Sequence, residues 1–365
     1  MKAALFSALR YQGPSENVGW PVSSTVYSHE AAHNSLQQAL DQFQMADELG
    51  FDWVSVAEHH YAPFSLTPNP MILAGALTQV VKRAKIALLG ATIPINNPIR
   101  VAEEFAMLDA LTGGRIVAGM LRGTPNEYVT YNINPAESRA RFEEALQLIK
   151  MAWTSTEPFG WLGKYYEYRS VSLWPRVVQT PHPKIYMSGS SPESGEFAAK
   201  NRIGLGFAVT SVPVAAEAAD YYREQCRRFG HEPEPEDIIY RVGVHVAESD
   251  DAAIDDFTEA MRTGPKGSLT MANRALESAV AATGYYGRDA EAQRNRLMPG
   301  GLRERVEEGR ILLGSPATVL KQIETIRRDL GAGVLDLTVT HQMGAKTNRS
   351  IELIAEKILP VIRPW

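Results

Sequence analysis

The chain has 365 residues, of which 44% are hydrophobic and 22% charged, with a formal net charge of −5 at pH 7. This composition is typical of a globular protein with a full core. The slight acidic balance argues against a general binder of nucleic acid or of membrane surfaces, because such proteins carry a basic face.

Cysteine content and apolar run lengths narrow the class of protein further. The single cysteine, Cys226, excludes an intrachain disulfide and a CxxC metal knuckle. No apolar run approaches the roughly 18 residues that span a membrane. The opening MKAALFSALR has a shorter apolar run than a signal peptide. A cytoplasmic protein is therefore expected.

Eight short apolar runs predict strands. Each run is rich in Val, Ile, Leu or small residues and does not alternate cleanly, which is typical of parallel strands covered on both faces. The runs lie at residues 3–9, 53–58, 85–93, 115–121, 184–189, 204–209, 238–247 and 334–340.

Amphipathic stretches between these runs predict helices, among them residues 35–50, 69–84, 99–114 and 136–153. Gly50 and Gly113 stand where helix C-terminal caps belong. Eight strands that alternate with helices favour an α/β fold, a closed (β/α)8 TIM barrel, as a single domain over residues 1–365. An open doubly wound sheet is the structural alternative, because a count of strands does not prove closure.

Two segments interrupt the alternation of strands and helices. Residues 160–180 alternate with period two and are rich in aromatics, which predicts an inserted β-hairpin before the fifth strand. Residues 261–310 are irregular over a length that is usually a functional loop. We expect a lid-like segment there, and a surface excursion without a role is the alternative.

The second predicted strand ends in Glu58, His59 and His60. Active sites of parallel barrels lie at the carboxyl ends of the strands, so these residues are candidates. A metal site would require further ligands, such as His245 and His341, but no H-x-H pair or carboxylate cluster accompanies them. A proton-handling or cofactor-facing site is the preferred interpretation, and a structural histidine pair is the other alternative.

Two further strand ends carry groups suited to an anion. The fourth strand ends at Arg122 and Gly123, which offer a guanidinium and a backbone that a ligand can approach closely. The fifth is followed by Ser190, Ser191 and Ser194 in a turn that opens a helix. Helix N-terminal amides and hydroxyls suit a phosphate, such as that of a flavin.

Four blocks of the sequence are similar to a known family. They are ELGFDWVSVAEHHYAPFSLTPNP, IPINNPIRVAEEFAMLDALTGGRIVAGMLRG, PHPKIYMSGSSPESGEFAAKNRIGLGFA and LLGSPATVLKQIETIRRDLGAGVLDLTV. With them the chain resembles the bacterial-luciferase-like flavin-dependent monooxygenases, (β/α)8 barrels that bind reduced FMN and activate oxygen. The likeness spans nearly the whole chain and is weakest over 250–310.

The resemblance also implies roles for single residues. His59 matches the family's catalytic histidine, with Glu58 and His60 beside it in the flavin shell. Arg122 and the serines at 190, 191 and 194 would hold the FMN phosphate. Leu89-Gly90 falls where the luciferases place a non-proline cis peptide under the flavin ring. Leu121 stands where light-emitting members can carry a reactive cysteine, and Ser190 replaces an acidic residue of theirs, so light emission is not expected.

The reaction that the resemblance implies uses reduced FMN and O2, which form a flavin C4a-(hydro)peroxide that inserts one oxygen atom into a small organic substrate. No G-x-G-x-x-G nicotinamide motif follows a strand, so a separate flavin reductase is expected as a partner. A homodimer is also expected. The alternatives are a deazaflavin-dependent oxidoreductase of the same fold, a non-catalytic flavin-binding barrel and a metallo-hydrolase.

Overall fold

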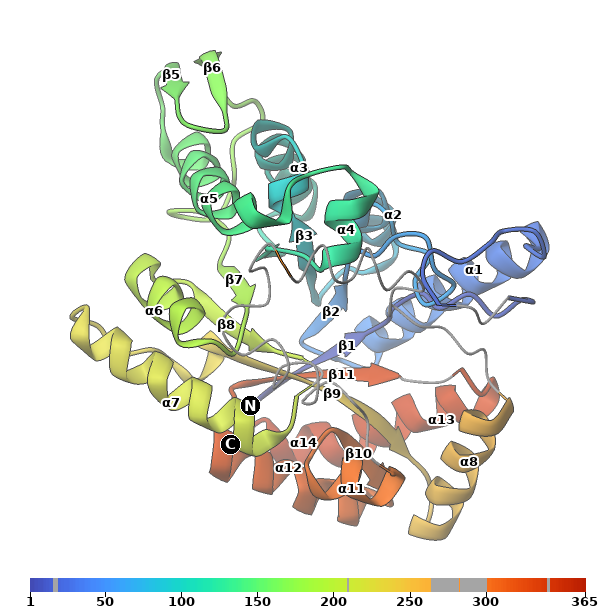
Figure 1. Cartoon of the computed structure of the whole chain (residues 1–365). Helices are drawn as coiled ribbons and strands as arrows, with labels where there is room; N and C mark the ends of the chain where they lie inside the picture. The colour runs from blue at the N-terminus through green and yellow to red at the C-terminus, as the bar shows by residue number, and fades with distance from the viewer. Residues whose placement is uncertain (16–18, 209, 264–281, 283–300, 340–341) are drawn as a thin grey trace.

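The computed structural model describes residues 1–15, 19–208, 210–263, 282, 301–339 and 342–365. Eight parallel strands form a closed barrel with helices outside it (Figure 1). These strands are β1 (Lys2–Phe6), β2 (Trp53–Val56), β3 (Lys85–Thr92), β4 (Ile116–Leu121), β7 (Ile185–Ser188), β8 (Gly204–Phe207), β9 (Ile238–Val246) and β11 (Val334–Val339).

The barrel strands pair in chain order, and the β8–β9, β9–β11 and β11–β1 pairings complete the circle. Each strand overlaps one of the eight predicted runs, so the predicted TIM barrel is confirmed and the open sheet is wrong. A further strand, β10 (Ile311–Gly314), pairs with β9 at Gly243–Val246, beyond the part of β9 that pairs with β8. The four-residue β10 was not predicted, because it runs directly into the following helix and offers too short a pattern.

Several of the covering helices begin at side-chain caps, which set where these helices start. Ser28 caps α1, so this helix begins six residues before the predicted start, and Asn69 and Asn97 cap α2 and α3. The longer helices are α1 (His29–Glu48), α2 (Pro70–Val80), α3 (Pro98–Thr112), α5 (Ser138–Thr154), α6 (Pro192–Asn201), α7 (Val212–Arg228), α8 (Asp250–Thr263), α12 (Pro316–Leu330) and α13 (Ala345–Leu353). Shorter ones are α4 (Pro125–Thr130), α11 (Leu302–Glu307) and α14 (Leu359–Ile362). No helix in the described ranges is both long and apolar enough to cross a lipid bilayer.

The segment predicted as a hairpin contains two antiparallel strands, β5 (Phe159–Leu162) and β6 (Glu167–Val171). The hairpin stands at the edge of the molecule beside α5 (Figure 1). Glu144 on α5 holds the hairpin turn by accepting hydrogen bonds from the backbone amides of residues 164, 165 and 166. The other predicted insertion, residues 261–310, lies mostly outside the described residues.

The amino-terminal end of the barrel is filled by apolar side chains. Trp53 and Tyr186 meet edge to face there, with ring centroids 5.9 Å apart, and Ile239 and Val334 pack beside them. All four are at most 3% exposed. Solvent and ligands therefore reach the barrel interior from the carboxyl ends of the strands, where the candidate residues lie.

Candidate active site

The predicted site residues lie within or directly after four consecutive strands of the barrel, β2, β3, β4 and β7. Ala118 on β4 pairs with Ile185 on β7. The same register, continued along both strands, places their carboxyl ends at the same level. The acid-His-His turn, the Leu89-Gly90 peptide, Arg122 and the serine turn are therefore grouped round one side of the barrel mouth.

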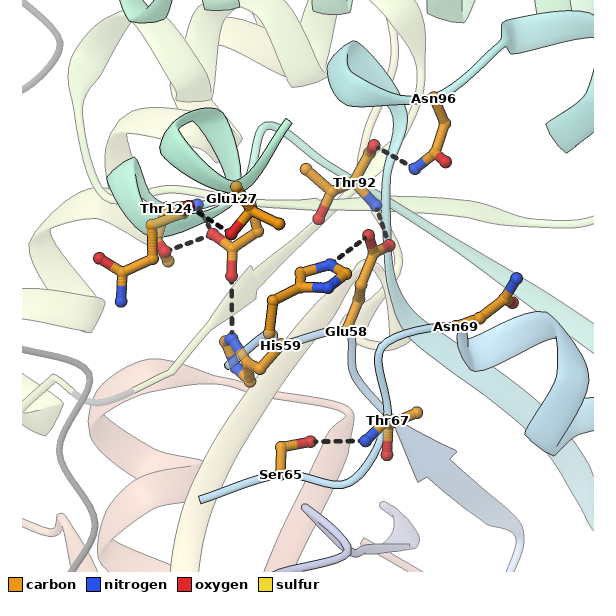
Figure 2. A network of polar contacts seen from close by, with 12 residues as sticks. Glu58, His59, Ser65, Thr67, Asn69, Thr92, Asn96, Thr124 and Glu127 are labelled. Carbon is orange, nitrogen blue, oxygen red and sulfur yellow. Dashed lines mark hydrogen bonds and ion pairs between the residues drawn. The ribbon is translucent and has the colours of Figure 1, made fainter. Parts of the chain in front are cut away.

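His59 is oriented by a carboxylate that the sequence did not single out. Its Nδ1 lies 3.2 Å from Oε1 of Glu127 on α4, and Figure 2 shows the two side chains meeting. The Glu127 side chain is 1% exposed and that of His59 is 21% exposed. The backbone amide of His59 donates to the Thr67 carbonyl, and the ring meets Phe64 edge-on. The imidazole is thus held at the edge of solvent.

The charge of Glu127 determines which nitrogen of His59 carries a proton. Burial alone would raise the pKa of the Glu127 carboxyl, but the hydrogen bond and charge of His59, with two hydrogen bonds from Thr124, lower it overall. An ionised carboxylate only accepts hydrogen bonds, so Nδ1 of His59 donates. Nε2 makes no hydrogen bond to the described part of the chain. This nitrogen is the one available to take a proton from a ligand or to return it.

Glu58 and His60 form a second, buried pair. His60 Nε2 lies 3.1 Å from Glu58 Oε1, while Glu58 Oε2 accepts the backbone amide of Thr92 at 2.9 Å. Figure 2 shows Glu58 reaching toward Thr92 at the end of β3, on the side opposite Glu127. The pair ties the exit of β2 to the exit of β3.

Two glycines bring the backbones of β3 and β4 unusually close. The Leu89–Gly90 peptide bond is cis, as the resemblance implied. A Cβ at Gly90 would lie 2.6 Å from the Gly119 carbonyl oxygen, and a Cβ at Gly119 would overlap the Leu88 carbonyl. The backbones of β3 and β4 therefore pack directly against each other here, because neither glycine carries a Cβ.

Arg122 and Gly123 leave β4 beside this backbone. Arg122 is partly exposed, and its carbonyl accepts the Tyr128 hydroxyl. Gly123 has φ +87°, a conformation that favours glycine, and a Cβ there would overlap the Thr92 side chain.

The serine turn opens α6. Ser191 caps the helix by accepting the Ser194 amide, and its Oγ lies 3.2 Å from Ser194 Oγ. Ser190 is exposed and Ser194 is buried. A Cβ at Gly189 would lie 2.6 Å from the Ser194 side chain, so only glycine allows the hydroxyls to gather here.

Of the further ligands that a metal site would require, only His245 is described. His245 lies 3.2 Å from Asp256 on α8, and His341 lies outside the described residues. Within the described ranges, no three His, Cys, Asp or Glu side chains are placed to hold a metal ion together.

Sequence reasoning missed Glu127, Arg241 and Asp336. Glu127 belongs to a T-x-x-E capping box, a pattern that by itself indicates only a helix start. Arg241 and Asp336 lie inside the apolar strands β9 and β11, and a charged residue inside such a run was the signal that could have found them.

Comparison with known proteins agrees with this arrangement. The family model for luciferase-like monooxygenases matches residues 16–333. The oxygenase component of a flavin-dependent trigonelline monooxygenase from Acinetobacter baylyi is 26% identical over 59% of this chain and 61% of that protein. Alignments with three curated relatives, this one included, span 53%, 61% and 56% of those proteins, so the chain matches little more than half of their length.

Solved structures match along the whole chain. The monooxygenase RslO1 from Streptomyces bottropensis is 26% identical with a TM-score of 0.78, and the likeness covers 99% of both chains. The oxygenating constituent of 3,6-diketocamphane monooxygenase from Pseudomonas putida, solved in complex with FMN, shares the fold at 21% identity and a TM-score of 0.74, over 99% of this chain and 98% of that one. From the family match and the closed barrel, we conclude that the chain belongs to the luciferase-like monooxygenase family.

Proposed function

We propose that the protein is an FMN-dependent monooxygenase, which uses reduced flavin and O2 to insert one oxygen atom into a small organic substrate. The observation that carries this proposal is the grouping of the His59–Glu127 pair, the cis Leu89–Gly90 peptide, Arg122 and the serine turn at one side of the barrel mouth.

The residues at the mouth suit FMN in their chemistry. Arg122, Gly123 and the hydroxyls of Ser190, Ser191 and Ser194 at the N-terminus of α6 would hold the phosphate, since guanidinium groups and helix amides favour such anions. The cis Leu89–Gly90 peptide would lie against the flat ring, as the resemblance to the family implies.

The reacting end of the site is assigned to His59. When bound, reduced FMN supplies the electrons that activate O2. His59 Nε2 would hold or move a proton beside the ring, and Glu127 would stabilise the charge that the imidazole gains. Glu58 and His60 would position the His59 turn against β3, because their pair bonds the Thr92 amide.

Two protein partners belong to this proposal. A separate flavin reductase would supply reduced FMN, in line with the trigonelline relative, which is named as an oxygenase component. A second copy of the chain would cover an apolar face of α2 and α3, where Ile72, Met107 and Leu111 are 75%, 56% and 56% exposed.

The proposed function can be tested by binding and by isotope labelling. Reduced FMN should bind in an anaerobic titration. With a flavin reductase and ¹⁸O2 present, mass spectrometry should find one labelled oxygen atom in a product from a panel of aldehydes, ketones, sulfonates and polycyclic metabolites. Hydride transfer from a reduced deazaflavin without O2 would contradict the proposal, and so would the absence of any flavin binding.

A further inference from the structure

An ion pair crosses the inside of the barrel, below the residues described so far. Arg241 on β9 donates from Nε to Asp336 Oδ2 on β11 at 2.6 Å, and the Ser55 hydroxyl donates to the other carboxylate oxygen. The Arg241 Nη2 donates to the Leu89 carbonyl at 3.2 Å. The guanidinium carbon lies 3.6 Å from the centroid of the Phe6 ring.

This guanidinium lies near the axis of the barrel. Strands β9 and β3 are four strands apart by either route round the eight-stranded circle, so the contact from Arg241 to Leu89 spans the interior. The apolar layer of Trp53 and Tyr186 closes the barrel at its amino-terminal end. Arg241 therefore lies on the side of this layer that faces the carboxyl ends of the strands.

The two side chains of this ion pair differ in their exposure to solvent. The Asp336 side chain is 1% exposed and both of its oxygens accept hydrogen bonds, whereas the Arg241 side chain is 18% exposed. The Nη1 of Arg241 has no hydrogen-bond partner in the part of the chain that the structure describes. Because the amino-terminal end is closed, this exposed part faces the mouth.

Stability alone does not account for such a pair. Taking two charges out of water is costly, and well-packed apolar residues of similar volume often serve a fold as well or better. The neighbouring layer shows that apolar side chains can fill this barrel. A guanidinium with spare donors, held rigidly beside the Leu89 carbonyl, instead has the features of a group prepared to meet a ligand.

We propose that Arg241 is a flavin-binding residue that makes the site bind reduced, anionic flavin more tightly than oxidised, neutral flavin. This inference rests on the proposed FMN function, in which Leu89 and Gly90 would hold the flavin ring. Reduced flavin readily loses a ring proton and then carries negative charge on its pyrimidine part. A fixed positive charge in a poorly solvated site favours that form, and charges near the ring nitrogens are a principal means by which proteins tune a flavin.

Asp336 and Ser55 act through Arg241. Asp336 holds the guanidinium in place by its bond to Nε, and Ser55 orients the carboxylate. A preference for reduced flavin suits an enzyme that receives its flavin from a separate reductase, because spent, oxidised flavin is then released.

The experiment compares dissociation constants of oxidised and reduced FMN by anaerobic titration, at a pH where free reduced flavin is anionic. The preference is the constant for oxidised FMN divided by that for reduced FMN. We expect Arg241→Met to lower this ratio by about tenfold, because it removes the charge and keeps most of the stem. Arg122→Gln is the matched control. It should weaken the binding of oxidised and reduced FMN equally and change the ratio by less than about twofold, since the phosphate keeps its charge in both redox states.

The reduction potential of bound flavin gives a second readout, which a merely structural role would not move. It should fall in Arg241→Met and stay unchanged in Arg122→Gln. If Arg241→Met does not fold, Arg241→Lys takes its place, and its ratio should fall by about threefold, because an ammonium lacks the planar fork that meets both Asp336 and Leu89.

The outcomes separate this inference from the proposed function. A folded Arg241 variant with the ratio and the potential of the unsubstituted protein overturns the inference, while FMN binding that depends on Arg122 leaves the proposed function standing. A protein that binds neither form of FMN overturns both.

Discussion

Oε1 of Glu127 lies 3.2 Å from Nδ1 of His59, so a buried carboxylate on α4 orients an imidazole that follows β2. The other oxygen of Glu127 accepts the amide and hydroxyl of Thr124, which starts α4. One side chain thus caps a helix and directs the ring that we assign to proton transfer.

Replacing His59 by asparagine should lower oxygen-dependent product formation by about a hundredfold or more, because positioned acid–base groups contribute about 10²–10⁴ in rate. The dissociation constant of reduced FMN should change little, since the phosphate contacts remain. Product is measured with the substrate found in the ¹⁸O2 panel. His33→Asn, at an exposed position of α1, is the matched control and should keep full activity. Full activity in His59→Asn would refute the assignment.

Glu127→Gln should cost stability in a pH-dependent way. The folded pKa of Glu127 is lowered, so ionised Glu127 stabilises the fold above the ordinary glutamate pKa of about 4.3, and this contribution disappears as the pH falls through the lower folded value. At neutral pH the variant should lose about 1.5–3 kcal/mol of unfolding free energy, as is typical of hydrogen bonds to charged groups. Urea denaturation of both proteins across pH tests this. A difference in unfolding free energy between the two proteins that grows toward acid pH would contradict this prediction.

Arg122→Gln should weaken FMN binding by about tenfold to a hundredfold, because a hydrogen bond to a charged group is worth about 1.5–3 kcal/mol. Binding of riboflavin, which lacks the phosphate, should stay nearly unchanged. Arg100→Gln removes an arginine whose side chain is 71% exposed on α3, and it should affect neither ligand. Equal weakening of FMN and riboflavin would show that Arg122 does not meet the phosphate.

Two glycine substitutions should have opposite effects on thermal unfolding. Gly119→Ala places a Cβ against the Leu88 carbonyl, so it should destabilise the barrel by about 1–3 kcal/mol, the usual cost of overpacking. Gly75→Ala lies inside α2 with nothing within 4 Å of the added Cβ, and it should stabilise by up to about 1 kcal/mol through helix propensity. A tolerated alanine at 119 would contradict the close approach of β3 and β4.

Leu111→Glu should yield a monomer if the exposed face of α2 and α3 joins two copies, because a buried unpaired carboxylate strongly disfavours association. Ile254→Glu, at an exposed apolar position on α8, is the matched control and should leave the dimer intact. Light scattering coupled to gel filtration measures both masses. A parent protein that is already monomeric would refute the proposed dimer.

Much of the fold was predictable because its signals are local. Apolar runs mark each barrel strand. Asn side chains mark helix starts at Asn69 and Asn97, and the left-handed backbone of Gly113 marks a helix end. The exits of parallel strands meet at one end of a barrel, so the sequence also indicated that His59, Arg122 and the serine turn would share a mouth. The start of α1 was placed too late, because the cap Ser28 precedes the amphipathic part of the helix.

The sequence by itself determined that the chain forms a barrel and that polar groups lie at the carboxyl ends of its strands. The reason is that strand patterns, helix caps and the residues after each strand depend only on near neighbours in the chain. The tertiary structure alone decided which charges meet. Glu127 lies 68 residues from His59, and Asp336 lies 95 residues from Arg241, yet each pair bonds directly. Such contacts depend on which strands pair and on closure of the barrel. Pairing of β9 with β11 places Arg241 opposite Asp336, and closure carries Arg241 across to β3. No sequence pattern within a short stretch of the chain indicates that closure.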